Sequence, residues 1–145
     1  MEITARHHLR SDAIAEIAEA LAGQLGVELH ADTVEEVELA DSDRDVVLVD
    51  REPLVFYDRG DPFLTVKGAN EYPPDRRVVT VDAGAVQFVS SGADVMRPGI
   101  VDADESIEAG DLVVIAEETH GKVLAIGRAR VDGDELLGDS GKVID

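Results

Sequence analysis

Apolar side chains recur at every third or fourth position near the start of the chain, at Ile14, Ile17, Leu21 and Leu25. This spacing places them on one face of an α-helix. Ser11 carries a side chain that can cap a helix, and Asp12 suits the positive N-terminal end of one. Gly26 is a residue type that commonly ends helices. The pattern therefore predicts a helix that begins at Ser11 and ends at Gly26.

Shorter segments rich in β-branched and aromatic residues follow, and they predict strands. In the first half of the chain these segments are VELHA (27–31), VEEVELA (34–40), DVVLVD (45–50), PLVFYD (53–58) and FLTVKG (63–68). The third and fourth are predicted to pair, and DRGDP (58–62) is predicted to be a turn. Pro73 and Pro74 then remove two backbone donors and disfavour helix. We therefore predict a domain boundary at this connector, with domains at 1–75 and 76–145.

The second half combines strands with one short helix. RRVVTVD (76–82) predicts a strand, and AGAVQFVSSGAD (83–94) predicts a short helix that ends at Gly92. VMRPGIVD (95–102) predicts a strand bent at Pro98 and Gly99. Residues 108–118 and 121–131 are predicted to form two buried strands joined by a turn at His120–Gly121. Residues 132–141 are predicted to form a loop or a single helical turn. The predicted fold class is α+β.

The charge of the chain is its most unusual property. The chain has 32 acidic and 13 basic residues, which gives a formal net charge of -19, and only three of the basic residues are Lys. The acids are spread along the whole length, and self-repulsion of this size destabilises a compact state unless salt screens it. We interpret the charge as adaptation to a salty cytoplasm, with a halophilic archaeon as the expected source. An acidic face that docks a basic protein is the alternative.

Composition also limits the chemistry. The chain has no Cys, which excludes disulfides, thiolate catalysis and Cys-bound zinc. No apolar run approaches the roughly 20 residues of a membrane helix, and the N-terminus does not resemble a signal peptide. We therefore expect a cytoplasmic protein without a membrane partner.

Catalytic and metal-binding motifs are missing. The sequence contains no G-x-S-x-G, no glycine-rich phosphate loop and no H-E-x-x-H. Its four His residues lie in three unrelated places, and His7 and His8 are expected to be exposed polar residues. The segment DGDELLGD (132–139) lacks the spacing of a calcium loop. The sequence predicts a protein that is not an enzyme and that uses no cofactor or metal.

One stretch nevertheless has a recognisable pattern. The strand VVTVD is followed by Gly84-Ala85-Val86 opening the helix, by DVMRPGI, by I-x-A-G-D-L-V-V-I from Ile107 to Ile115, and by VLAIGRARV. This arrangement resembles the PUA domain, the small RNA-binding module of pseudouridine synthases and archaeosine transglycosylases. The resemblance covers residues 76–145. Residues 1–75 resemble, mainly by arrangement, the pre-PUA domain of archaeal PUA proteins of the translation-associated MCT-1 type.

The resemblance implies an N-terminal α/β pre-PUA domain and a C-terminal mixed β pseudo-barrel with a short helix. It implies non-catalytic binding of structured RNA, tRNA or rRNA, with a translation factor or the ribosome as further candidate partners. Arg97 is expected to contact phosphate or sugar, and Gly84 to leave helix N-terminal amides open to phosphate. The candidate RNA-binding residues are Gly84, Ser91, Gly92, Met96, Arg97, Pro98, Gly99, Arg128 and Arg130, with Arg76 and Arg77 as secondary contacts.

One departure from the family pattern affects this expectation. Family members continue beyond GKVID into a strand that closes the barrel, whereas this chain is expected to stop as that strand begins, so that the strand is truncated or abbreviated. The alternative function is a protein-interaction adaptor in translation, in which the pre-PUA half docks a partner factor and RNA contact is incidental.

Overall fold

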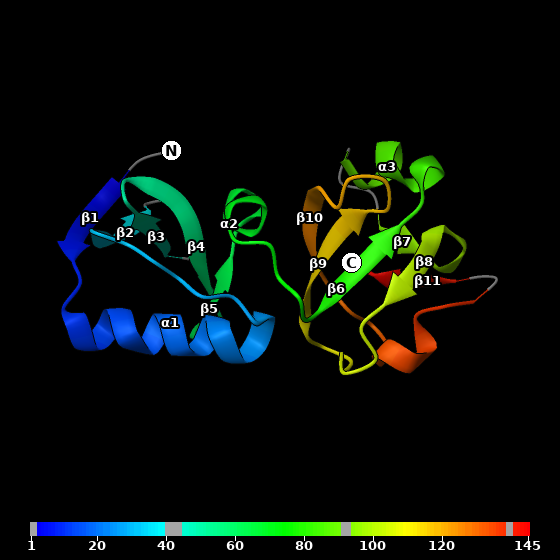
Figure 1. Cartoon of the computed structure of the whole chain (residues 1–145), viewed down its shortest axis with the longest axis horizontal. Coiled ribbons are helices and arrows are strands. Elements are labelled where there is room, and N and C mark those ends of the chain that lie inside the picture. Colours follow the sequence, from blue (N-terminus) through cyan, green and yellow to red (C-terminus); the bar gives the residue numbers. More distant parts are fainter. Residues whose placement is uncertain (1–2, 40–44, 91–93, 139–140) are drawn as a thin grey trace. The chain divides into compact units, whose positions relative to one another are not determined.

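The chain forms two compact units, Met1–Pro73 and Pro74–Asp145, in the computed structural model (Figure 1). The structure describes residues 3–39, 45–90, 94–138 and 141–145. Ser91 and Gly92, and with them the predicted end of the second helix, lie outside the described residues. None of the described helices is long and apolar enough to cross a membrane.

The N-terminal unit is built on one antiparallel sheet. Its strands are β1 (Ile3–His8), β2 (Val34–Leu39), β3 (Val46–Val49), β4 (Glu52–Asp58) and β5 (Asp61–Leu64), and they lie in the sheet in chain order. The long helix α1 (Ser11–Leu25) runs between β1 and β2, and the short helix α2 (Val66–Glu71) follows β5. The buried residues of α1 are Ile17, Leu21 and Leu25, three of the four that the helical spacing brought together.

Both ends of α1 lie where the sequence predicted them, but only the C-terminal cap is the predicted residue. Gly26 adopts the left-handed conformation with φ 69°, and its amide donates to the Ala22 carbonyl, so it ends the helix as predicted. The predicted cap at Ser11 is wrong. Arg10 is the capping residue, and its carbonyl accepts from the Ile14 amide at 3.0 Å, which makes Ser11 the first helical residue.

Three further predictions for this unit are corrected. Residues 27–31 form no strand but connect α1 to β2, and Val27 is buried there while His30 and Ala31 are exposed. The strand β1 was missed, since its Arg-His-His end shows no strand pattern, although His7 and His8 are exposed as expected. The segment 63–68 is a strand only to Leu64, because the Thr65 hydroxyl accepts from the Gly68 amide and starts α2.

The C-terminal unit is a mixed β structure with one short helix. In chain order it contains β6 (Val78–Val81), α3 (Ala83–Ser90), β7 (Val95–Met96), the 3₁₀ turn η1 (Arg97–Gly99), β8 (Ile100–Ala103), β9 (Leu112–Glu117), β10 (Val123–Arg128), the 3₁₀ turn η2 (Gly133–Glu135) and β11 (Lys142–Ile144). One sheet has the order β10-β9-β6-β8, in which β6 and β9 are parallel, and β11 pairs with β7. The bend predicted at Pro98–Gly99 is η1, which lets β7 and β8 belong to different ladders.

The segment at which the closing strand was expected only to begin is already paired as a strand, while the expected truncation or abbreviation stays a prediction. Residues 142–144 form β11, antiparallel to β7, and the same segment bridges to the continuation of β10. The Arg130 amide donates to the Val143 carbonyl at 2.8 Å, and the Asp145 amide donates to the Arg128 carbonyl at 3.0 Å. Since Ile144 is fully buried, this strand joins the two ladders and completes the core of the unit.

Candidate functional site

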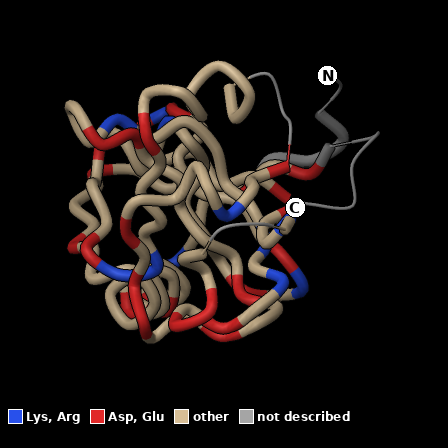
Figure 2. The backbone as a smooth tube through the Cα atoms, turned by 90° about the vertical axis from the view of Figure 1, so that its right-hand side faces the viewer, with Lys and Arg blue, Asp and Glu red and all other residues tan. Residues whose placement is uncertain are grey.

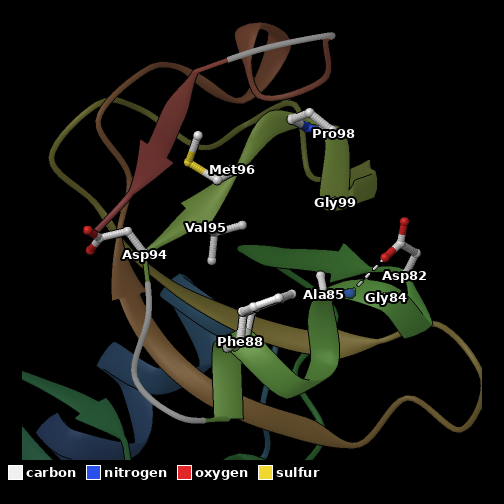
Figure 3. Close-up of a pocket in the computed structure, with 10 residues that line it drawn as sticks. Asp82, Gly84, Ala85, Phe88, Asp94, Val95, Met96, Pro98 and Gly99 are labelled. Carbon is white, nitrogen blue, oxygen red and sulfur yellow. Dashed lines mark hydrogen bonds between the residues drawn. The ribbon is translucent and has the colours of Figure 1, made fainter.

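A groove of about 530 Å³ opens on the C-terminal unit between α3 and the segment formed by β7 and η1 (Figure 3). It is lined by Asp82, Gly84, Ala85, Phe88, Val89, Asp94, Val95, Met96, Pro98 and Gly99. Asp82 and Asp94 lie on opposite sides of this set (Figure 3), and the other lining residues are apolar or glycine. The groove is therefore an apolar surface with a carboxylate at each end.

Two large apolar side chains that line the groove are exposed to solvent. Phe88 is 63% exposed and Met96 is 49% exposed, while Val89 and Val95 beside them are buried. Figure 3 shows Val95 between the two exposed side chains. Apolar surface that remains exposed on a folded unit and gathers around a groove is typical of a binding site.

The backbone of η1 packs closely against α3 beside the groove. A Cβ atom on Gly99 would lie 2.9 Å from the Ala85 Cβ, so glycine lets η1 approach α3. The Asp82 amide donates to the Gly99 carbonyl at 2.9 Å and ties the start of the helix to the same turn. Pro98 and Gly99, both predicted site residues, therefore line the groove as well as shape it.

The N-terminus of α3 is capped by the protein itself. Asp82 Oδ1 accepts from the Ala85 amide at 2.9 Å, in the position where an anion would otherwise bind. The Ala85 amide is therefore not open to phosphate, while the expected role of Gly84 in RNA binding stays a prediction. Gly84 has no positive φ, and a Cβ on it would meet only Asp82 Oδ1, at an ordinary 3.4 Å.

Arg97 does not line the groove. Its Nε donates to the Glu135 carbonyl at 2.9 Å, and its side chain lies against the backbone of Gly138 and Gly141. The side chain thus links η1 to η2 and packs against these two glycines. These intramolecular contacts do not test whether Arg97 binds an RNA phosphate, so that role stays a prediction.

The other predicted arginines are also engaged with the protein. Arg128 Nη1 donates to the Gly110 carbonyl at 2.7 Å, and Arg130 Nε lies 3.5 Å from Asp145 Oδ2. Arg128 is the last residue of β10, and Arg130 lies beyond it. Arg77 Nε lies 3.9 Å from Asp111 Oδ2, and Arg76 is exposed. Figure 2 shows acidic positions along the whole chain, with fewer basic positions between them.

Sequence reasoning missed six of the residues that line the groove, and three of them carry an aromatic ring or a charge. Phe88, Asp82 and Asp94 line it, and none was among the predicted site residues. A signal for Phe88 was present, because aromatic residues are only 3% of the chain and this one lies in a helix of eight residues that is too short to bury all its apolar positions. Asp94 had no such signal among 32 acidic residues. Its Oδ2 accepts from Lys142 Nζ of β11 at 3.1 Å.

Comparison with known proteins agrees with this geometry. A family model described as the PUA domain matches residues 77–144, from the start of β6 through β11. Residues 77–144 are a PUA domain. The predicted family is thus confirmed, and the match reaches the end of the closing strand that the sequence had led us to doubt.

Relatives extend the match beyond the PUA domain. An uncharacterized protein of Methanocaldococcus jannaschii is 43% identical over 110 residues, which are 74% of this chain and 68% of the relative. Translation machinery-associated protein 20 of Saccharomyces cerevisiae is 34% identical over 94 residues, 61% of this chain and 52% of the relative. A conserved PUA domain protein from Thermoplasma acidophilum has a solved structure with a TM-score of 0.83 at 28% identity, covering 97% of this chain and 90% of that chain. The chain thus matches about half the length of the yeast relative.

Proposed function

We propose that this PUA protein binds structured RNA, tRNA or rRNA, without catalysing a reaction, in translation or RNA modification. The binding face consists of α3, β7 and η1, with β11 beside them. The observation that carries the proposal is the groove with Phe88 and Met96 exposed, because it lies within residues 77–144 that match the PUA domain. The yeast relative, a translation machinery-associated protein, supports the proposed role in translation.

The charge distribution favours recognition by short-range contacts. Most RNA-binding surfaces use many Lys and Arg, and their affinity falls steeply as salt rises. Here the arginines Arg97, Arg128 and Arg130 already contact protein acceptors, and the chain carries a net charge of -19. Stacking, backbone hydrogen bonds and shape are less sensitive to salt, which suits the salty archaeal cytoplasm that we propose as the working environment. Residues 1–75 act in this proposal as the pre-PUA domain.

RNA binding is tested by fluorescence polarisation with labelled tRNA and with labelled rRNA stem-loops, over a range of KCl concentrations. We expect binding by the whole chain, and a loss of about tenfold or more in the Phe88→Ala/Met96→Ala double variant, since stacking is worth roughly 1–3 kcal/mol per base. Leu137→Ala is the matched control, because Leu137 is 52% exposed on the same unit and does not line the groove.

Two results would contradict the proposal. One is the absence of binding to every RNA tested by a chain that circular dichroism shows to be folded. The other is a native-salt co-purification that returns a translation factor but no RNA, and this result would favour the adaptor function.

A further inference from the structure

We propose that the groove holds one unpaired base of the bound RNA, and that Asp94 selects bases with an exocyclic amino group. This inference rests on the proposed RNA binding and adds a specificity to it. The selected bases are cytosine, adenine and guanine, and the rejected base is uracil.

The size and lining of the groove favour a base over a larger group. Its volume of about 530 Å³ lies within the 300–1,000 Å³ of pockets that take small ligands. A groove of this size accommodates a flat ring or two but not the length of a docked helix. Phe88 on α3 offers an exposed aromatic face for stacking, and Val95 of β7 lies opposite it, while the Met96 side chain points away from Phe88 at the edge of the groove (Figure 3).

The charges at the groove determine which part of a nucleotide enters it. Among its lining residues are two carboxylates, Asp82 and Asp94, and no Lys or Arg. A phosphate inside the groove would meet negative charge at both ends. An uncharged base is not repelled in this way, so the base enters and its phosphate stays at the rim.

Asp94 is the carboxylate suited to read the base. Lys142 Nζ contacts its Oδ2 at 3.1 Å from the neighbouring strand β11, which orients the carboxylate. A carboxylate accepts on both oxygens, so Asp94 keeps capacity for a second donor. Asp82 is less suited, because its Oδ1 already caps α3 through the Ala85 amide.

An exocyclic amino group can donate a hydrogen bond to the Asp94 carboxylate, whereas a carbonyl oxygen is repelled by it. The N4 amino group of cytosine and the N6 amino group of adenine donate to a carboxylate, and an Asp or Glu acceptor is an established partner of cytosine N4. Uracil has no amino group, and carbonyl oxygens flank its ring N–H and would be repelled by Asp94. Replacement of the carboxylate by an amide, which offers an NH₂ donor, should therefore weaken this preference.

The test uses the whole chain and hairpin RNAs that share one stem and differ only in a short unpaired tail of cytidines, adenosines or uridines, with a blunt hairpin as reference. For the wild-type chain we expect the cytidine and adenosine tails to tighten binding about tenfold over the blunt hairpin, within the range of one stacked base. We expect the uridine tail to add less than about threefold. Asp94→Asn should reduce the cytidine-over-uridine ratio by about fivefold or more, in the range of one base contact, and Phe88→Leu should reduce the gain from every tail.

Matched controls separate these effects from charge and folding. Asp134→Asn changes the same group at an exposed position outside the groove and should leave the ratio unchanged. Phe88→Tyr keeps the aromatic face and should retain the gain from the tails. Equal affinity for blunt and tailed hairpins, or an unchanged ratio in Asp94→Asn, would overturn this inference and leave RNA binding intact. Failure of every hairpin to bind would overturn the proposed function itself.

Discussion

The Arg97 side chain reaches across to Glu135, whose carbonyl oxygen accepts from Arg97 Nε at 2.9 Å. The residue that the sequence suggested as an RNA contact thus links η1 to η2, which leads into the segment before β11. The same segment passes close to the arginine at Gly138 and Gly141, where added Cβ atoms would lie 2.8 Å from Cδ and 3.1 Å from Nη1. Structural and RNA-binding roles of Arg97 are therefore to be measured separately.

Arg97→Ala should lower the free energy of unfolding by about 1–2 kcal/mol, since the substitution removes a hydrogen bond from a charged donor. Chemical denaturation with circular dichroism measures this loss, and Lys122→Ala, at an exposed hairpin position, is the control. RNA affinity is then compared at a temperature where both variants are folded. A weakening of roughly 1–3 kcal/mol there would support the predicted phosphate contact, while unchanged affinity would restrict Arg97 to its structural role.

Gly99→Ala should destabilise the chain by about 1–3 kcal/mol, because the new methyl group overlaps the Ala85 side chain. Gly84→Ala is the matched control and should be neutral or slightly stabilising, since its Cβ has room in α3. The double variant Gly99→Ala/Ala85→Gly should recover part of the loss. Equal effects of the two glycine substitutions would show that the packing of η1 on α3 does not require glycine.

Glu36→Gln should raise the melting temperature at pH 7. Burial, then a side-chain hydrogen bond and negative charge from Asp45, raise the pKa of Glu36 above its ordinary value of 4.5. A carboxyl group with a raised pKa binds its proton more tightly in the folded state, so its ionisation destabilises the fold above that pKa and has no such effect below 4.5.

The advantage of Glu36→Gln should therefore shrink as the pH falls from 7 toward 4. Thermal melts at several pH values measure the difference between variant and wild type. Glu19→Gln, at an exposed position of α1, is the control. A difference that grows on acidification would contradict the raised pKa.

Stability should rise with KCl. Repulsion among the charges that make up a net -19 is screened as the Debye length falls from about 10 Å at 0.1 M to about 3 Å at 1 M. The melting temperature is measured from 0.1 M to multi-molar KCl, and RNA affinity over the same range. We expect the affinity to depend weakly on salt, or to improve at first. A flat melting temperature would refute the proposed adaptation to high salt.

A fragment that begins at Pro74 should fold alone in high salt. The C-terminal unit has its own buried cluster, in which Val79, Val113 and Ile144 are fully buried, and β11 closes it. Circular dichroism and a cooperative thermal transition test this prediction. A fragment without a cooperative transition in multi-molar KCl would show that the unit depends on residues before the connector.

The glycine and proline signals were the most reliable guides in the sequence. Gly26 ends α1, and Pro98 and Gly99 form the bend between β7 and β8, because these residue types restrict or release the backbone wherever they occur. The dense apolar segments around Val47, Val55 and Val114 became strands for a similar reason, as β-branched residues suit a buried sheet. Local chemistry decides such features, so one sequence suffices to predict them.

Most of the helices and strands, the PUA resemblance and the charge could be predicted from the sequence, since they follow from neighbouring residues and composition. Tertiary structure alone decided where side chains point. Asp82 became a helix cap, Arg97 turned to Glu135, and Phe88 with Asp94 came to line one groove. The Lys142 contact with Asp94 joins residues 48 positions apart. Pairings of this kind depend on how distant strands close on each other, and no local pattern of residues records that.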